Sequence, residues 1–333
     1  DAKRIRSRII HGWAPSTRAT YGSGLLLFHE FCDRRQVPEH LRAPAHHSLL
    51  EAFVAAMAGA YAATTLGNAL AGVRAWHIAH RLPWAVEKSG MRTLMQAAKA
   101  LAPLSSKRKE RPPCTVDYLE TAHRLLDLDS PKDAAVWACA TSAFWSLAPL
   151  GELAVPSVLA YNPRRHVHPA CVKQTHFDSE YFSSVTSIFI PFTKVDKHKG
   201  ETVMWARQEG VSDPEAAYRN HIRINAPAEN DHLFSYLIDG THVPLSQATF
   251  LRRWHEIATA SNLDPLTGHC FRIGGTLEYL LRGVPFDVIK TFGRWSSDAF
   301  QLYLRQHEKI LAPYIQAQPP HAPSPRIQMP KVR

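Results

Sequence analysis

The stretch GHCFRIGGTLEYLLRGVPFDVIKTFGRWSSDAFQLYLRQHE, residues 268–308, decides the fold of this chain. Its His269 and Arg272 stand three residues apart where a helix is expected to begin, so their side chains share one helix face. Unpaired backbone N–H groups at a helix start favour an anion, and together these groups form a good phosphate site. The same spacing also fits an ordinary surface salt bridge. Tyr303 follows 31 residues after Arg272, within a second predicted helix.

The order of these residues resembles the catalytic core of the tyrosine recombinases, the phage-integrase family, in which H-x-x-R is followed by His or Trp and then by Tyr. The sequence motifs FRIGGT at 271–276 and GRWSSDAF at 293–300 are most similar to those of the eukaryotic branch, which is carried by crypton-type and DIRS-type mobile elements. The resemblance covers most of the chain. It implies a mainly α fold with a small antiparallel β-sheet (α+β), arranged as a two-domain, C-shaped DNA clamp. A helical core-binding domain would precede a tyrosine-recombinase catalytic domain.

The resemblance implies a chemical role for three of these side chains. Tyr303 would attack the scissile phosphate and form a 3′-phosphotyrosyl bond, although a phenol with a pKa of about 10 needs help at neutral pH. Arg272 would hold phosphate oxygens of the transition state through its planar N–H donors. His269 would add a donor or move a proton. Because the covalent ester conserves the energy of the broken bond, the reaction needs no ATP, and no metal or other cofactor is expected.

The stretch IPFTKVDKHKGETV has the strand, turn and strand of a β-hairpin. The family places there a lysine that protonates the 5′-oxygen leaving group; Lys194 is the chosen candidate, with Lys197 and Lys199 as rivals on the same turn. Three ordinary turn lysines are the simpler reading. The His/Trp position of the family is ambiguous by one residue, because spacing from the tyrosine selects Arg294 whereas residue type selects Trp295. Either side chain can donate a hydrogen bond to a phosphate oxygen.

One position departs from the pattern of the family. The first catalytic arginine normally begins the motif R-L-G-E, but this chain reads P-L-G-E, with Pro149 in the arginine position. Proline carries no charge and no donor, and losing one transition-state donor is expected to cost about 2.7–4 kcal/mol. Arg164 or Arg165 is a candidate substitute. Glu152 would steady His269, with an ordinary surface charge at a helix end as the alternative.

Composition and charge indicate a folded protein that binds a polyanion. The 333 residues are 45% hydrophobic, which is typical of a globular chain long enough for two domains. Residues 1–113 contain 17 Lys and Arg against 7 Asp and Glu, whereas residues 114–333 contain 22 of each. The whole net charge of +10 therefore lies in the first third, which suggests that this part grips nucleic acid. A well-solvated basic surface is the alternative reading.

Several classes of protein do not fit the sequence. No apolar run reaches the roughly 20 residues of a membrane span, and no secretory signal is expected. The five cysteines are scattered without a C-x-x-C pair, which favours a reducing compartment over a zinc or disulfide framework. The nineteen histidines show no H-E-x-x-H spacing, so a metal site is not expected.

The sequence predicts five segments along the chain. The stretch PLSSKRKERPP is a poor core segment and would separate the two domains. Its Lys107, Arg108, Lys109 and Arg111 would track a DNA backbone, although a solvated hinge or a nuclear-import patch fits equally well. The segments are a flexible basic arm (1–15), a helical core-binding domain (16–102), a basic linker (103–114), the catalytic domain (115–316) and a Pro-rich disordered tail (317–333).

Hydrophobic periodicity predicts the elements of both domains. The first domain reads as four helices and shows no alternation of period two, whereas the second is mixed. One predicted helix begins at Ser16 or Thr17, and another begins at Thr64 or Thr65. The other predicted helices are 47–60, 89–101, 115–128, 131–147, 213–224, 246–261, 269–282, 285–292 and 297–310. The predicted strands are 171–177, 185–192 and 202–206.

Two functional hypotheses from different classes follow. The first is an enzyme, a site-specific recombinase or integrase of a mobile element that works on double-stranded DNA as a homodimer or tetramer on paired sites. The second is a weakened or domesticated relative that binds a DNA sequence without cutting it, and Pro149 is the feature that favours it. A nicking enzyme similar to topoisomerase IB is a remote third. The eukaryotic resemblance implies a nuclear location.

Overall fold

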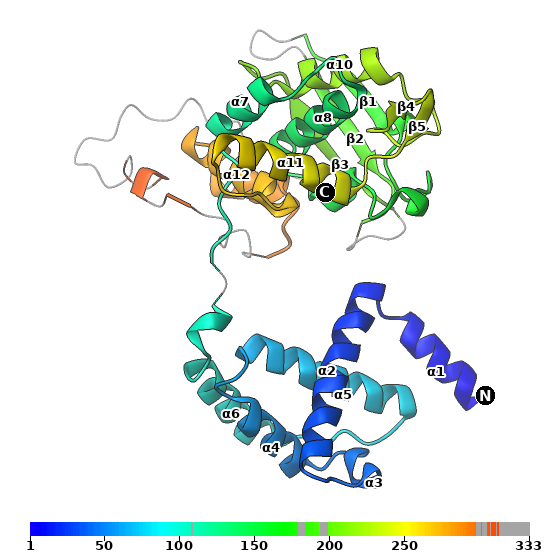
Figure 1. The fold of residues 1–333 in the computed structure, drawn as a ribbon, viewed down its shortest axis with the longest axis vertical. Helices are drawn as coiled ribbons and strands as arrows, with labels where there is room; N and C mark the ends of the chain where they lie inside the picture. The colour runs from blue at the N-terminus through cyan, green and yellow to red at the C-terminus, as the bar shows by residue number, and fades with distance from the viewer. Residues whose placement is uncertain are drawn as a thin grey trace. The chain divides into compact units, whose positions relative to one another are not determined.

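The chain forms two compact units, unit 1 (residues 1–110) and unit 2 (residues 111–333), in a computed structural model (Figure 1). The division falls within the basic stretch 103–114 that the sequence singled out as a linker. The structure describes residues 1–107, 109–178, 184–193, 199–297, 301, 305–306, 308–310 and 312. Within these residues, no helix combines the length and the apolar character that a membrane span requires.

Unit 1 is built from helices around a small apolar core. Phe28 and Phe53 meet edge to face at the centre, with ring centroids 5.5 Å apart. The two long helices of the unit, α2 and α5, approach closely because Gly72 of α5 has no side chain. A Cβ on Gly72 would lie 2.4 Å from the backbone oxygen of Tyr21 in α2. The four predicted helices of this domain are present as α2, α4, α5 and α6, and α1 and the short α3 are additional. The elements are α1 (Ala2–His11), α2 (Pro15–Arg34), α3 (Glu39–Arg42), α4 (His47–Met57), α5 (Ala63–His80), α6 (Lys88–Ala100) and the 3-10 turn η1 (Leu104–Ser106).

The start of the chain differs from the flexible arm that the sequence predicted. Residues 2–11 form helix α1, which packs against α5. Ile5, Ile9 and Ile10 are half-buried on one face of α1, and this apolar face is the physical reason for the helix. Arg6 adds a hydrogen bond from Nη1 to His80 Nε2 at 3.2 Å.

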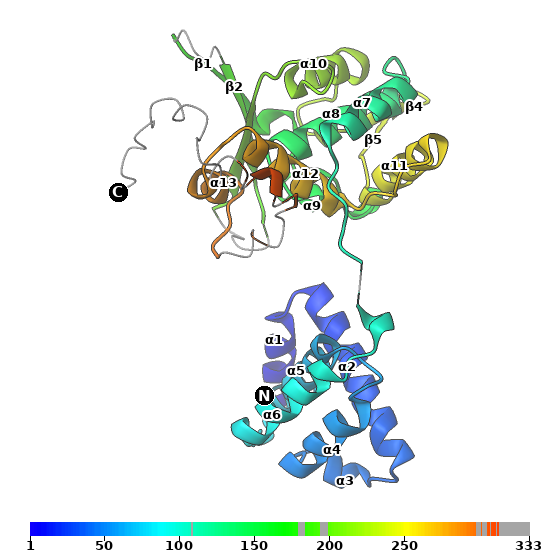
Figure 2. The same ribbon diagram turned by 90° about the vertical axis from the view of Figure 1, so that its left-hand side faces the viewer.

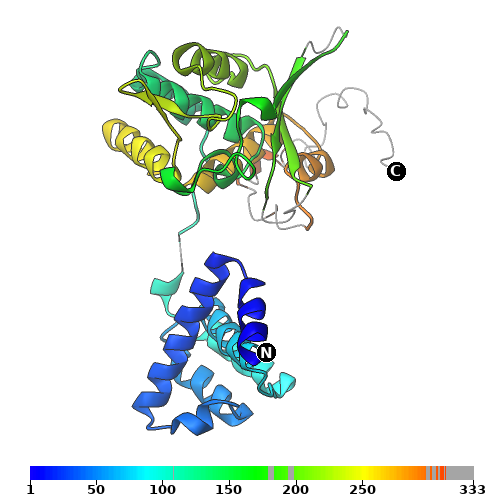
Figure 3. The same cartoon turned by 90° about the vertical axis from the view of Figure 1, so that its right-hand side faces the viewer.

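Unit 2 is mainly helical with two small antiparallel sheets, which confirms the predicted fold class. The first sheet has the order β1-β2-β3, and Ile188 pairs with Val203 across the predicted hairpin. Figures 2 and 3 show this sheet on one side of the unit and α11 on the opposite side. The elements are α7 (Val116–Leu125), α8 (Pro131–Trp145), α9 (Leu150–Leu153), η2 (Val158–Ala160), η3 (Pro169–Cys171), β1 (Val172–His176), β2 (Ser184–Ile190), β3 (Glu201–Ala206), α10 (Pro214–Asn225), β4 (Tyr236–Ile238), β5 (Thr241–Val243), α11 (Gln247–Ser261), α12 (Gly268–Leu281) and α13 (Phe286–Phe292).

The hairpin β4–β5 is an element that the sequence analysis missed. Its turn consists of Asp239 and Gly240, both with positive φ, at 48° and 75°. An Asp-Gly pair between two short apolar runs is a strong hairpin signal, so the information was present in the sequence.

Helices α8 and α12 form the centre of unit 2. Every residue of α8 from Asp133 to Trp145 is buried. Helix α12 lies tightly against its surroundings because two adjacent glycines remove side chains at the contact. A Cβ on Gly274 would lie 1.7 Å from the backbone oxygen of Cys114, and one on Gly275 would lie 2.1 Å from that of Phe144. This close approach sets the position of every side chain that α12 carries.

We expect Gly274→Ala to lower the free energy of unfolding of unit 2 by about 3 kcal/mol, because backbone must move to admit the methyl group. Gly151→Ala is the matched control, since its Cβ would meet the Gln247 side chain at an ordinary 3.5 Å. This control should change the free energy by about 0.5 kcal/mol or less. Urea unfolding followed by circular dichroism measures both, and equal effects would contradict the packing account.

Two histidines are buried in unit 2 as neutral side chains. His221 hydrogen-bonds through Nε2 to the Leu233 carbonyl at 2.8 Å, while its Nδ1 lies 3.0 Å from the Asn225 amide nitrogen. Burial lowers the pKa of His221 to about 4 and that of His232 to about 3. The unfolded chain therefore binds these protons below about pH 6.5, whereas the folded chain does not. Acid consequently destabilises the fold through both groups.

We expect the stability of unit 2 to fall as the pH drops from 6.5 towards 3, with about 3 kcal/mol coming from His221 by pH 4. His221→Gln should make the decline with falling pH shallower, although it also lowers the stability at pH 7. The exposed His255→Gln is the control and should leave the slope unchanged. Identical slopes for the two variants in urea titrations would refute this assignment.

Candidate functional site

The candidate site is built around the first turns of α12. Thr267 caps this helix, and its backbone N–H donates to the Cys270 Sγ at 3.3 Å. Gly268 lies against α9, since a Cβ there would sit 2.7 Å from Leu150 Cδ2. The start of α12, which carries His269 and Arg272, is therefore held beside the P-L-G-E segment that precedes it by more than a hundred residues.

Arg272 is held by the segment that follows α13. Only 9% of the residue is exposed, and its Nη2 donates a hydrogen bond to the carbonyl oxygen of Gly293. Its guanidinium carbon lies 4.3 Å from the centroid of the Trp295 ring, which is a cation–π contact. The structure thus brings together two residues that the sequence singled out, with the guanidinium over the indole ring.

His269 lies in a positive environment. Burial lowers its pKa below the usual 6.5, and the charges of Arg111 and Arg272 lower it further. His269 is therefore a neutral imidazole at pH 7, which can accept a proton. Arg111, which the sequence analysis grouped with the linker, is exposed, and its charge acts on His269. Nothing in the sequence except its place in a basic run indicated this.

Arg294 has a different role from Trp295 in the structure. Its φ is +58°, and its Nη1 and Nη2 lie 2.7 Å from Glu201 Oε2 and 2.5 Å from Glu152 Oε2. The guanidinium, 15% exposed, therefore joins α9, the start of β3 and the segment after α13. Glu152, which was expected to steady His269, pairs with Arg294 instead. Arg294 and Trp295, the two candidates for the His/Trp position, thus make different contacts: Arg294 pairs with carboxylates, whereas Trp295 packs on Arg272.

The position of Pro149 follows from its neighbours. It is the residue immediately before α9, half-buried, with φ −59°, and it adjoins the Leu150 that packs on Gly268. Position 149 thus lies beside the start of α12, and it contributes no charge there. Of the two candidate substitutes, Arg165 places its guanidinium 4.3 Å from the ring centroid of Phe192, and Arg164 is exposed.

Three predicted site residues, Tyr303, Lys194 and Arg108, lie outside the described residues, as does Lys197. Lys199 is described, next to Gly200 with φ +68° at the foot of β3. The linker residues Lys107 and Lys109 are both exposed. Within the described part of the chain, no group of three His, Cys, Asp or Glu side chains is arranged to hold a metal ion.

We expect Arg294→Met to destabilise unit 2 by about 2 kcal/mol, because it leaves the carboxylates of Glu152 and Glu201 without their shared partner. Most of this loss should be recovered when both glutamates are also changed to glutamine. Arg223→Met is the matched control, because its ion pair with Asp129 is exposed and should contribute less than about 1 kcal/mol. Urea unfolding measures all variants, and equal losses would contradict the assignment.

Comparisons with known proteins identify the fold. No protein-family model and no curated protein sequence matches the chain. Among solved structures, it resembles the XerH site-specific recombinase bound to palindromic difH substrate in a post-cleavage complex, with a TM-score of 0.56 and 14% identity over 89% of this chain and 79% of that one. The pre-cleavage complex of XerH with difH gives a TM-score of 0.54, with the same identity and coverage. The chain therefore has the tyrosine recombinase fold that its sequence predicted.

Proposed function

We propose that this chain is a site-specific DNA recombinase that cleaves and rejoins double-stranded DNA through a 3′-phosphotyrosyl bond. The observation that carries the proposal is that His269 and Arg272 both lie on the first turns of α12, where the charges of Arg111 and Arg272 act on His269. Two guanidinium groups and an imidazole around a helix N-terminus suit a phosphodiester. The fold shared with a recombinase that was solved on its DNA substrate supports the same conclusion.

The resemblance assigns a cleavage reaction in which every proton and bond is accounted for by the protein and the DNA, so no external reagent is needed. The phenol oxygen of Tyr303 attacks phosphorus, its proton passes to His269, and the bond from phosphorus to the 5′-oxygen breaks. Lys194 returns a proton to that oxygen, and ligation is the reverse. Arg272 stabilises the extra negative charge of the phosphorane-like state. The lowered pKa of His269 keeps its imidazole deprotonated at neutral pH, so that a ring nitrogen is open to a proton.

A second candidate function rests on Pro149. If no other group replaces the missing arginine, the chain keeps a phosphate-binding site but stabilises the transition state poorly. It would then act as a sequence-specific DNA-binding protein descended from a recombinase. On either reading we expect a C-shaped clamp on duplex DNA and a homodimer or tetramer on paired sites. The sequence resemblance to crypton-type and DIRS-type elements supports the further proposal that the protein belongs to a mobile element and works in the nucleus.

A nicked suicide substrate tests the enzyme hypothesis. The duplex is first selected from a random library by retention on the protein, and a nick is then placed next to the site of strand cleavage. We expect a covalent protein–DNA complex that forms slowly. Pro149→Arg should raise its rate of formation by about a hundredfold, because it restores one transition-state donor.

Tyr303→Phe is the control, and it should abolish the covalent complex while leaving retention of the duplex unchanged. Denaturing gels measure the complex, and filter retention measures the binding. Specific retention without any covalent complex in the wild type or in Pro149→Arg would refute the enzyme hypothesis and favour the DNA-binding protein. A covalent complex that persists in Tyr303→Phe would show that the nucleophile is wrongly assigned.

A further inference from the structure

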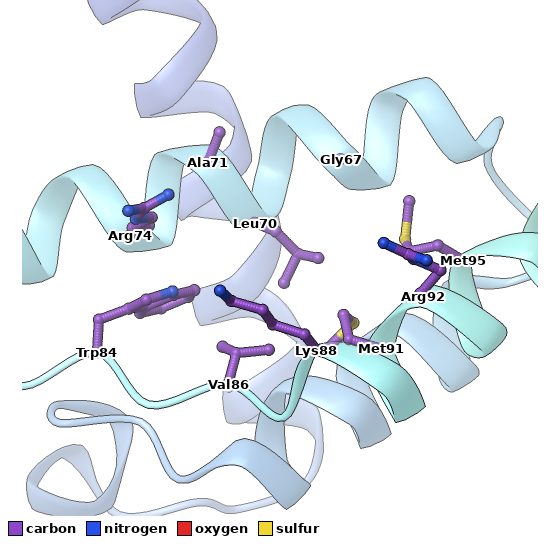
Figure 4. A pocket seen from close by; sticks show the side chains of 10 residues that line it. All are labelled: Gly67, Leu70, Ala71, Arg74, Trp84, Val86, Lys88, Met91, Arg92 and Met95. Atoms are coloured by element: carbon purple, nitrogen blue, oxygen red, sulfur yellow. The ribbon is translucent and has the colours of Figure 1, made fainter.

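Unit 1 contains an apolar hollow that the proposed function does not use. It has a volume of about 640 Å³ and lies between α5, α6 and the loop that joins them (Figure 4). Its apolar lining belongs to the outer layer of the unit 1 core, and Met91 is its most buried member. The ring of Trp84 is fixed against His77 at 5.1 Å, edge to face. The apolar side chains are Leu70, Trp84, Val86, Met91 and Met95.

Three cations surround this apolar surface. Arg74, Lys88 and Arg92 are exposed, and within the described part of the chain none of them makes a hydrogen bond or an ion pair. Figure 4 shows Arg74 beside Trp84 at one end of the hollow, Arg92 beside Met95 at the other, and Lys88 between them. The hollow therefore combines apolar surface with three cations that make no ion pair within the described part of the chain.

The sequence builds the hollow from two helix faces with the same spacing. On α5 the lining residues lie at 67, 70, 71 and 74, and on α6 at 88, 91, 92 and 95. Each set follows the i, i+3, i+4, i+7 pattern of a single helix face. Gly67 keeps the space open, because its missing side chain would point towards Met95, whose Cε lies 3.8 Å from the Cβ position.

We propose that this hollow binds an acidic amphipathic helix of a partner protein. Such a helix carries apolar side chains on one face, which would cover Trp84 and the methionines, and carboxylates beside them, which would pair with the three cations. Flexible methionine side chains suit a surface that adapts to a partner. A duplex phosphate backbone would engage the cations but would leave the apolar lining in water. The site lies within unit 1 and does not depend on the chemistry of Tyr303.

Methionine methyl NMR on the full chain tests the proposal directly. The chain has five methionines, and only Met91 and Met95 line the hollow, so Met57 and Met204 serve as internal references. The probe is a synthetic peptide helix with leucines along one face and glutamates on either side of them. The expected result is a shift of the Met91 and Met95 methyl signals with the reference signals unchanged. A scrambled peptide of the same composition has no apolar face and should cause no shift.

Two variants separate charge from shape. Arg92→Glu should weaken peptide binding at least about threefold, whereas Lys99→Glu, an exposed cation on α6 outside the hollow, should have a smaller effect. Gly67→Leu should abolish binding by filling the hollow. Because Gly67 lies inside a helix and its Cβ position would make an ordinary contact with Met95 at 3.8 Å, this variant should not lower the melting temperature.

Three outcomes would overturn the proposal. One is equal binding of the ordered and scrambled peptides, which would indicate attraction by charge alone. Another is that the Met91 and Met95 methyl signals do not shift even at the highest concentration at which the peptide is soluble. The third is that duplex DNA rather than the peptide shifts these methyl signals and that Gly67→Leu weakens DNA binding, which would make the hollow part of the DNA surface. None of these outcomes bears on the covalent complex through Tyr303.

Discussion

The burial of the Arg272 guanidinium against a carbonyl and an indole ring is the interaction on which the candidate site depends. A charged group is costly to remove from water unless polar groups replace its hydration. The Gly293 carbonyl accepts from Nη2, and the Trp295 ring covers the guanidinium plane. Both contacts hold the side chain in place. A positive group held in this way is prepared for an anionic ligand, because little reorganisation is required when the ligand arrives.

Arg294 supports this arrangement from between the two residues that touch Arg272. Its ion pairs with Glu152 and Glu201 secure the segment after α13 to two other elements of unit 2. Arg272 and Arg294 therefore have different roles in this arrangement. Arg294 is paired with two carboxylates and holds the backbone of this segment, and Arg272 contacts the Gly293 carbonyl and the Trp295 ring. Close packing of α12 at Gly274 and Gly275 makes the depth of Arg272 possible, because a side chain at either position would push the helix outwards.

The two units carry charge for different purposes. The excess of Lys and Arg lies in the first third of the chain, and it is the feature of the sequence that suggests a polyanion as partner. In residues 114–333 the charges balance, and two of the cations of unit 2, Arg111 and Arg272, act on His269. Unit 1 also places cations around an apolar hollow, an arrangement that a phosphate backbone alone does not require. Charge in this protein therefore has to be interpreted together with the surface on which it lies.

The sequence alone determined the fold class, most helices, the three-stranded sheet and the pairing of His269 with Arg272 on one helix, because periodicity and spacing are local properties. It also showed that Pro149 stands where an arginine was expected. Only the tertiary structure decided that Glu152 pairs with Arg294, that Trp295 covers Arg272 and that Arg111 acts on His269. These contacts join segments far apart in the chain, and their partners depend on how closely α9, α12 and β3 pack, which no spacing within a single segment encodes.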